Sequence, residues 1–285
     1  MDRKVALVTG ASSGIGAATA RRLHEGGYLV HAGARRVARM QDLAEDGISV
    51  VALDVADDSS MTGVVGKILA DHGRIDVLVN NAGYGSYGSV EDVPLAEGRY
   101  QLEVNLFGLA RLTQLVTPQM RAAGAGKIVN VSSIGGHLGE PLGAWYHASK
   151  FAVEGFSDSL RLELHPFGID VIVMEPGAIR TEWGKGALES AEKYSGDSAY
   201  GQQVHAMRAL YSHAERRGSE PEIVAEAIFK AISAAKPKAR YAVPFSAKAI
   251  IAAMNLVPDR LMDAGRHAAM ARLSKPRTRP STTDE

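Results

Sequence analysis

Thr9-Gly10-Ala11-Ser12-Ser13-Gly14-Ile15-Gly16 is the stretch that decides the fold, because it joins an apolar run, Val5–Val8, to a helix-like segment. Glycines at this spacing permit a tight strand-to-helix turn and let the backbone approach a pyrophosphate closely. The free N–H groups of the following helix can then bind phosphates. A plain glycine-rich turn is the alternative. The context favours a dinucleotide site formed by Gly10, Ser12, Ser13, Gly14, Ile15 and Gly16.

Short β-branched runs alternate with longer helical patterns along the rest of the chain. The expected strands are Val5–Thr9, Leu29–Gly33, Ser49–Leu53, Asp76–Asn80, Lys127–Val131, Asp170–Met174 and Arg240–Val243. Helices are expected after Asp57, over about 97–121, and from Tyr146 to before Pro166. This strand–helix–strand order predicts an α/β fold, a single doubly wound parallel sheet of the Rossmann type flanked by helices.

Three segments fall outside that alternation. Residues 184–218 are rich in glycine and polar residues, and we expect an irregular or partly helical insertion, either a surface excursion or a substrate lid. We assign residues 1–245 to one dinucleotide-binding and catalytic domain and residues 246–273 to a helical C-terminal extension of it. Residues 274–285 are polar, and we expect a disordered tail.

Composition narrows the classes of function. The 285 residues have a formal net charge of zero, which argues against a nucleic-acid partner. The chain has no cysteine, which excludes disulfides, thiolate catalysis and cysteine-ligated metals, and no metal site is expected. No signal-peptide core precedes Val5, and the apolar stretch Ala247–Val257 is too short to span a bilayer. We therefore expect a cytoplasmic protein.

A second motif, Tyr146-His147-Ala148-Ser149-Lys150, places a phenol and an ammonium on one helix face. Lowering a phenol pKa from ~10 to neutrality takes about 4 kcal/mol. A cation ~4 Å away supplies a similar amount at an effective dielectric of about 20. We therefore expect Lys150 to lower the pKa of Tyr146 almost enough for proton transfer, although burial opposes the shift. Taken alone, most such pairs are an interfacial tyrosine and a solvated lysine.

The end of the second expected strand indicates which nucleotide is bound. An acidic residue that would accept from the ribose 2′-OH of NAD is absent from Ala32-Gly33-Ala34-Arg35-Arg36. A guanidinium can bind a 2′-phosphate, so Arg35 and Arg36 favour NADP(H) over NAD(H). The alternative is that both arginines are solvated at a helix start.

Taken together, these motifs resemble the short-chain dehydrogenase/reductase family over about residues 4–245. The matching motifs are Thr9-Gly10-x-x-x-Gly14-x-Gly16, Asp54-Val55, Asn80-Asn81-Ala82-Gly83, Asn105, Ser133, Tyr146 with Lys150, and Pro176-Gly177 with Thr181. A finer and less specific likeness is to steroid and retinol dehydrogenases and to uncharacterised bacterial members.

The resemblance implies hydride transfer between a nicotinamide and a carbonyl or secondary alcohol. It implies that Tyr146 is the general acid/base and that Lys150 lowers the pKa of Tyr146 and holds the ribose. It also implies that Ser133 binds the substrate oxygen. It implies that Asn105 anchors a water linked to Lys150, unless Asn105 is a helix-bending structural residue. It further implies cofactor contacts from Asp54, Val55, Asn81, Ala82, Gly83, Tyr146, Lys150, Pro176, Gly177, Ile179 and Thr181.

The substrate pocket is expected between Ser86–Tyr87, His137–Trp145 and Ile179–Trp183. The apolar residues in these segments suit a lipophilic ketone or alcohol, or are ordinary loop packing. Ser132 competes with Ser133 for the catalytic position, because neighbours on a strand face opposite sides. His147 is expected on the helix surface.

Two other functions stay open. A non-catalytic NADP-binding sensor needs the glycine turn but has little use for the Tyr146–Lys150 pair. An epimerase or dehydratase of the related extended enzymes also uses such a pair. Family habit further implies a homodimer or homotetramer that acts on a small molecule.

Overall fold

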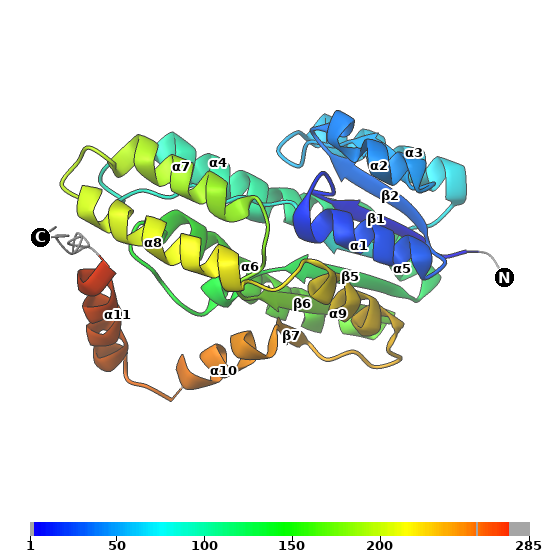
Figure 1. Ribbon diagram of the computed structural model, residues 1–285. Coiled ribbons are helices and arrows are strands. Elements are labelled where there is room, and N and C mark those ends of the chain that lie inside the picture. The colour runs from blue at the N-terminus through cyan, green and yellow to red at the C-terminus, as the bar shows by residue number, and fades with distance from the viewer. Residues whose placement is uncertain (1–2, 255, 274–285) are drawn as a thin grey trace, which may run out of the picture.

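The computed structural model describes residues 3–254 and 256–273 and is built on a seven-stranded parallel sheet (Figure 1). The strands run in the order β3-β2-β1-β4-β5-β6-β7. Their bounds are β1 Val5–Thr9, β2 Leu29–Ala34, β3 Ser49–Ala52, β4 Val77–Asn80, β5 Gly126–Val131, β6 Ile169–Pro176 and β7 Arg240–Val243. The predicted doubly wound α/β fold is confirmed.

The central strands are apolar because both faces of the sheet are covered. Every residue of β1 and of β4 is buried. Strand β6 extends beyond its predicted end at Met174 to Pro176. This extension brings Glu175 and Pro176 to the carboxyl edge of the sheet, where the ends of β1, β4 and β5 also lie.

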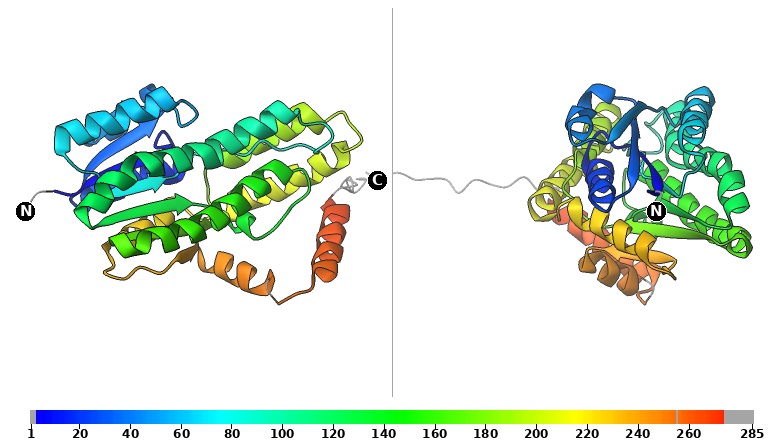
Figure 2. Two further views of the ribbon diagram at one scale, coloured as in Figure 1. Left: turned by 180° about the vertical axis from the view of Figure 1, so that it is seen from behind. Right: turned by 90° about the vertical axis from the view of Figure 1, so that its right-hand side faces the viewer.

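Helices form two layers over the sheet (Figures 1 and 2). One face packs against α1 (Gly14–Glu25), the short η1 and α2 (Val37–Met40, Gln41–Glu45), and α9 (Glu222–Ser233). The other face packs against α3 (Asp58–His72), α5 (Gly108–Ala123) and α6 (Ala144–Leu164). Helix α4 (Leu95–Leu102) joins α5 through a π turn at Glu103–Phe107, so the long helix expected over about 97–121 is present but interrupted.

Residues 184–218 are more regular than the sequence suggested. Of the two expected forms, irregular or partly helical, the helical one is found, because α7 (Trp183–Ser195) and α8 (Gly201–Arg217) occupy most of the segment. A helical glycine costs about 1 kcal/mol relative to alanine. Burial of Ala187, Ala191, Val204 and Met207 in one apolar cluster outweighs that cost.

The chain after β7 is helical. It consists of α10 (Phe245–Met254), which follows β7, and α11 (Asp259–Leu273), which packs beside α8 (Figure 2). No helix among the described residues combines the length and apolar character that crossing a membrane requires. The tail predicted over 274–285 lies outside the described residues.

Candidate active site

The glycine turn has the shape of a phosphate cradle. Gly10 and Gly14 adopt positive φ angles of 66° and 54°, which favour glycine. A Cβ on Gly16 would lie 2.4 Å from the Gly10 carbonyl oxygen, so a side chain does not fit there. Ser13 stands at the N-cap of α1 without capping it through its side chain. The backbone donors of the first helical turn therefore remain available to an anion.

The turn after β4 holds this cradle in place. The Asn81 side-chain amide donates to the carbonyl oxygens of Thr9 at 2.9 Å and Gly10 at 3.3 Å. The backbone N–H groups of Asn81 and Ala82 donate to Thr9 Oγ1 at 3.0 and 2.9 Å. After β3, the Asp54 carboxylate accepts from the Ala56 N–H at 3.0 Å. Its neighbour Val55 is buried against the α5 side of the sheet.

Two exposed arginines follow β2 beside the cradle. Arg36 donates to Ser12 Oγ at 3.4 Å, whereas Arg35 donates to the Tyr100 hydroxyl at 3.0 Å. Arg36 thus reaches the glycine turn more directly than Arg35 does. A third guanidinium, Arg39, pairs with Glu182 at 2.8 Å and lowers the pKa of that carboxyl. Sequence reasoning missed Arg39, although it lies one helical turn after Arg36.

The loop after β6 covers the cradle from the other side. Thr181 packs so closely on Gly14 that a Cβ there would lie 2.9 Å from Thr181 Cγ2. The Gly177 N–H donates to the Val243 carbonyl at 2.8 Å, which fixes the start of the loop beside Pro176. Ile179 forms an isolated parallel bridge with Ser219. The loop after β6 and the glycine turn are therefore in direct contact at Gly14 and Thr181.

Tyr146 and Ser133 meet at the carboxyl edge of the sheet. Their hydroxyls form a hydrogen bond with each other, and Ser133 Oγ also accepts from the Gly135 N–H at 3.0 Å. Ser132 faces the opposite side, and its buried hydroxyl makes no hydrogen bond with any described residue. Lys150 Nζ donates to the Val131 carbonyl at 2.9 Å and lies 5.9 Å from the centroid of the Tyr146 ring.

The expected lowering of the Tyr146 pKa is wrong for this structure. Burial raises the pKa of Tyr146 to about 12; the hydrogen bond with Ser133 acts against that rise and Glu140 adds to it. The expectation assumed an ammonium ~4 Å away in a medium of dielectric about 20. In the structure Lys150 Nζ lies 5.9 Å from the centroid of the ring, and burial of the phenol is the largest influence on its pKa. Burial also lowers the pKa of Lys150 itself to about 8, while Glu154 opposes that change.

Asn105 lies in the π turn between α4 and α5. Its Oδ1 accepts from the Tyr84 N–H at 3.0 Å, and its Nδ2 donates to the Tyr84 carbonyl at 2.9 Å and to Ser149 Oγ at 3.0 Å. Gly83 approaches both Asn105 and Lys150, since a Cβ there would lie 3.2 Å from Asn105 Oδ1 and 3.8 Å from Lys150 Nζ. Asn105 therefore ties the turn after β4 to α6.

Aromatic side chains enclose the phenol. The Trp183 and Tyr87 rings lie 4.8 and 5.8 Å from the Tyr146 ring, centroid to centroid. Tyr211 of α8 completes this wall at 6.0 Å from Trp183. Sequence reasoning missed Tyr211, which is remote in sequence from the other members. Trp145 does not join them, because its ring packs on Gly98 of α4.

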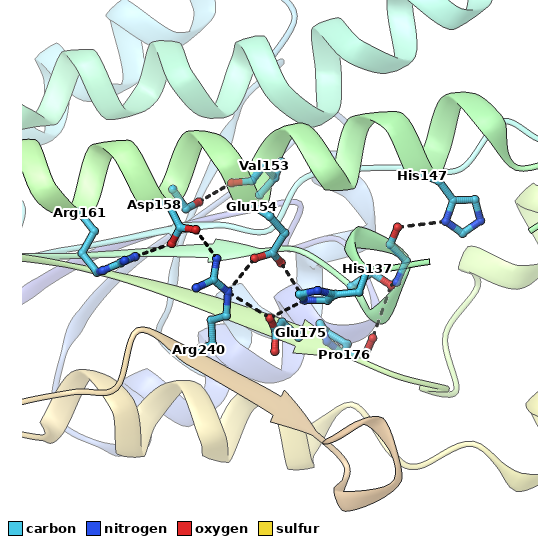
Figure 3. Close-up of polar contacts among 12 residues, drawn as sticks. His137, His147, Val153, Glu154, Asp158, Arg161, Glu175, Pro176 and Arg240 are labelled. Atoms are coloured by element: carbon cyan, nitrogen blue, oxygen red, sulfur yellow. Dashed lines mark hydrogen bonds and ion pairs between the residues drawn. The ribbon is translucent and has the colours of Figure 1, made fainter. Parts of the chain in front are cut away.

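Two histidines lie near the site, and one of them departs from its expected position. The surface position expected for His147 is wrong, because its Nδ1 lies 3.0 Å from the Gly135 carbonyl and its ring contacts Tyr87. The turn after Ser133 covers that side of α6. His137 points into a group of charged residues, with its Nε2 2.8 Å from Glu175 Oε1 (Figure 3).

Comparisons with known proteins agree with this geometry. The family model for short chain dehydrogenase matches residues 4–192. A probable short-chain type dehydrogenase/reductase of Helicobacter pylori, VdlC, is 37% identical over 91% of this chain and 95% of its own length. A 3-ketodihydrosphingosine reductase of Bacteroides thetaiotaomicron is 35% identical over 92% and 96%. An NADPH-dependent 3-dehydrocapnine reductase of Ornithobacterium rhinotracheale is 36% identical over 91% and 95%.

Solved structures give the same result. A short-chain dehydrogenase from Streptomyces avermitilis has a TM-score of 0.80 and 37% identity, covering 95% of this chain and 96% of that one. A variant of the actinorhodin polyketide ketoreductase with NADPH has a TM-score of 0.71 and 32% identity, covering 85% and 96%. The chain therefore belongs to the short-chain dehydrogenase/reductase family of oxidoreductases.

Proposed function

We propose that this protein is an NADP(H)-dependent oxidoreductase that transfers a hydride between the nicotinamide and a carbonyl or secondary alcohol of a lipophilic substrate. The observation that carries the proposal is the hydrogen-bonded Ser133–Tyr146 pair, with Lys150 one helical turn along α6. This group lies beside a glycine cradle that fits a dinucleotide. The names of the reductases at 35% and 36% identity describe carbonyl reduction.

The choice of NADP(H) over NAD(H) rests on charge. The segment Ala32-Gly33-Ala34-Arg35-Arg36 holds no acidic residue, and Arg36 reaches the glycine turn through Ser12. One charged hydrogen bond to a 2′-phosphate is worth about 1.5–3 kcal/mol, a preference of roughly ten- to a hundredfold. The relative named as NADPH-dependent supports the same choice.

The side chains of this protein would handle the proton of the reaction. When bound, the nicotinamide supplies or accepts the hydride. In reduction the Tyr146 O–H gives its proton to the substrate oxygen, and in oxidation the phenolate takes it back. Ser133 hydrogen-bonds the same oxygen, where negative charge develops. Lys150 stabilises the phenolate, and a water held near Asn105 returns the proton to Lys150.

A lipophilic substrate follows from the aromatic wall. Tyr87, Trp183 and Tyr211 surround Tyr146, and the small side chains of α7 complete an apolar cluster. Trp183, at the start of α7, lies 4.8 Å from the ring of Tyr146, centroid to centroid, so a movement of α7 would open this side of the phenol to a substrate. We therefore propose that residues 184–218 form the lid of the substrate site.

We also propose a homodimer or homotetramer. Phe107, Phe151 and Leu162 project from the π turn and α6 with 54%, 50% and 72% of their surface exposed. Apolar side chains this exposed on neighbouring helices are typical of an interface between subunits.

A screen of diverse ketones with NADPH, followed by the matching alcohols with NADP⁺, tests the proposal. We expect stoichiometric loss of NADPH absorbance with at least one lipophilic ketone and far slower loss with NADH. Tight NADPH binding without any turnover would instead support the sensor. Chemical conversion without net NADPH consumption would support an epimerase or dehydratase.

A further inference from the structure

A group of charged side chains that the proposed reaction does not use gathers between α6, β6 and β7 (Figure 3). It contains Glu154 of α6, Glu175 of β6, Arg240 of β7 and His137, which follows the turn that carries Ser133. Glu154 and Glu175 are only 7% and 3% exposed. Burying two carboxylates together is costly unless their charges are compensated.

Arg240 gives only part of that compensation. Its Nε lies 3.0 Å from Glu154 Oε2 and 3.4 Å from Glu175 Oε1, and its Nη2 donates to Asp158 at 2.7 Å. One guanidinium therefore serves three carboxylates, of which Asp158 also pairs with Arg161. Burial raises the pKa of Glu175, and Glu154 adds to the rise, whereas His137 and Arg240 oppose it.

The remaining oxygen of Glu154 is left without a hydrogen bond. Glu154 Oε1 is buried, makes no hydrogen bond with any described residue, and lies 4.0 Å from His137 Nε2. The stem of Glu154 is wedged against Gly136, where a Cβ would lie 2.9 Å from Glu154 Cγ. The carboxylate is thus held in one place by Arg240 on one oxygen and by the Ser133 turn along its stem.

Glu154 follows Lys150 by four residues, so the two side chains share one face of α6. Lys150 is almost completely buried, and among the described residues its Nζ donates one hydrogen bond, to the Val131 carbonyl. The titratable and charged groups that face this pair are Tyr146 on α6, His137 from the turn, Glu175 from β6 and Arg240 from β7.

We propose that Glu154 is a positioning residue whose fixed carboxylate, held by Arg240 and the Ser133 turn, keeps the Lys150 ammonium charged for Tyr146. The inference rests on the proposed function. Burial has already lowered the pKa of Lys150 to about 8, and the charge of Glu154 is what opposes a further fall. Without it, the pKa of Lys150 would fall further, and a neutral lysine could not stabilise the phenolate.

A bound divalent cation is a weaker explanation of the same cluster. The ligand atoms of His137, Glu154 and Glu175 lie within 4.8 Å of one another, a spacing that a metal ion could use. The guanidinium of Arg240 already contacts both carboxylates, and its positive charge would repel a cation there.

The test compares Glu154→Gln with Asp158→Asn, a matched control. Both substitutions remove one negative charge that contacts Arg240, but only Glu154 shares a helical turn with Lys150. Titration of lysine 13Cε resonances by NMR, with Lys150 assigned by its loss in Lys150→Met, reports the lysine directly and without cofactor. We expect the Lys150 titration to move about one pH unit lower in Glu154→Gln and to stay within about 0.2 unit of wild type in Asp158→Asn.

Turnover gives the second readout. The alkaline limb of kcat for ketone reduction should move to lower pH in Glu154→Gln by the same amount, with KM for NADPH within about twofold of wild type. Three results would overturn the proposal. The titration of Lys150 could be unchanged in Glu154→Gln, or it could shift equally in Asp158→Asn. The titration of Lys150 in wild type could also move when EDTA removes bound Zn²⁺. If no ketone is reduced by wild type, the proposed function fails, and the NMR titration still decides the role of Glu154.

Discussion

Replacement of Lys150 by methionine should make the protein more stable while removing its activity. The lysine is 7% exposed, and burial lowers its pKa from a usual value of 10.5 to about 8. That difference in pKa means that burying the charged ammonium costs about 3 kcal/mol of folding free energy. Methionine fills a similar volume without the charge. It forfeits the hydrogen bond to the Val131 carbonyl, worth about 1 kcal/mol. We expect Lys150→Met to be about 2 kcal/mol more stable at pH 7.

The pH dependence fixes the sign of this effect. Between pH 8 and 10.5 the unfolded chain keeps a proton on Lys150 that the folded chain has lost, so wild-type stability rises with pH in that window. Lys150→Met lacks this rise in stability, because methionine does not titrate. The difference in unfolding free energy between Lys150→Met and wild type should therefore be constant below pH 8. It should narrow by about 2 kcal/mol on going from pH 7 to pH 9.5.

Urea denaturation of wild type and variant at both pH values measures the gap. Lys67→Met is the matched control, since Lys67 is 71% exposed and pairs with Asp71 only at the surface. Its stability should stay within about 0.5 kcal/mol of wild type at both pH values. A Lys150→Met protein that is less stable than wild type at pH 7, or a gap that does not narrow with pH, would refute the reasoning.

Three further predictions follow from the cofactor groove and the surface. Arg35→Asp and Arg36→Asp should each lower the ratio of NADPH to NADH activity roughly ten- to a hundredfold. The larger loss is expected for Arg36, because it reaches Ser12. An unchanged ratio in both variants would contradict the assignment of NADP(H). Gly16→Ala should abolish NADPH binding measured by fluorescence, because its Cβ would lie 2.4 Å from the Gly10 carbonyl oxygen. In the control Gly63→Ala on α3, the new Cβ meets no atom within 4 Å, so the stability of the protein should be unchanged or higher. Light scattering at micromolar concentration should give the mass of a dimer or tetramer, and a monomer would contradict the interface proposed for Phe107, Phe151 and Leu162.

The fold was predictable because its signals are local. Strands β1 and β7 have the predicted bounds, and the glycine turn has the predicted strand–turn–helix context. Residues 184–218 were harder to predict, since glycines weakened a helical pattern that becomes stable only when α7 and α8 bury their small side chains against each other. The helices of that segment therefore depend on tertiary packing, which the local sequence does not show.

For the candidate site, the sequence supported a proposal for the residues but not for their electrostatics. Helical spacing paired Tyr146 with Lys150, whereas the resemblance to the family gave Ser133, with Ser132 as its rival; the structure brings the hydroxyl of Ser133 to Tyr146. The direction of the Tyr146 pKa shift depends on burial by Trp183 and Tyr87, which come from other elements. The buried contacts of Glu175 and Arg240 likewise join strands whose adjacency only the fold reveals.

The most direct test of the central claim is Tyr146→Phe, assayed beside wild type with a ketone that wild type reduces. The phenyl ring of the variant would keep the aromatic packing with Trp183 and lose only the hydroxyl that bonds Ser133. We predict that NADPH consumption falls by at least about a thousandfold while the NADPH dissociation constant stays within about threefold of wild type. Near-normal consumption of NADPH by Tyr146→Phe would contradict the account.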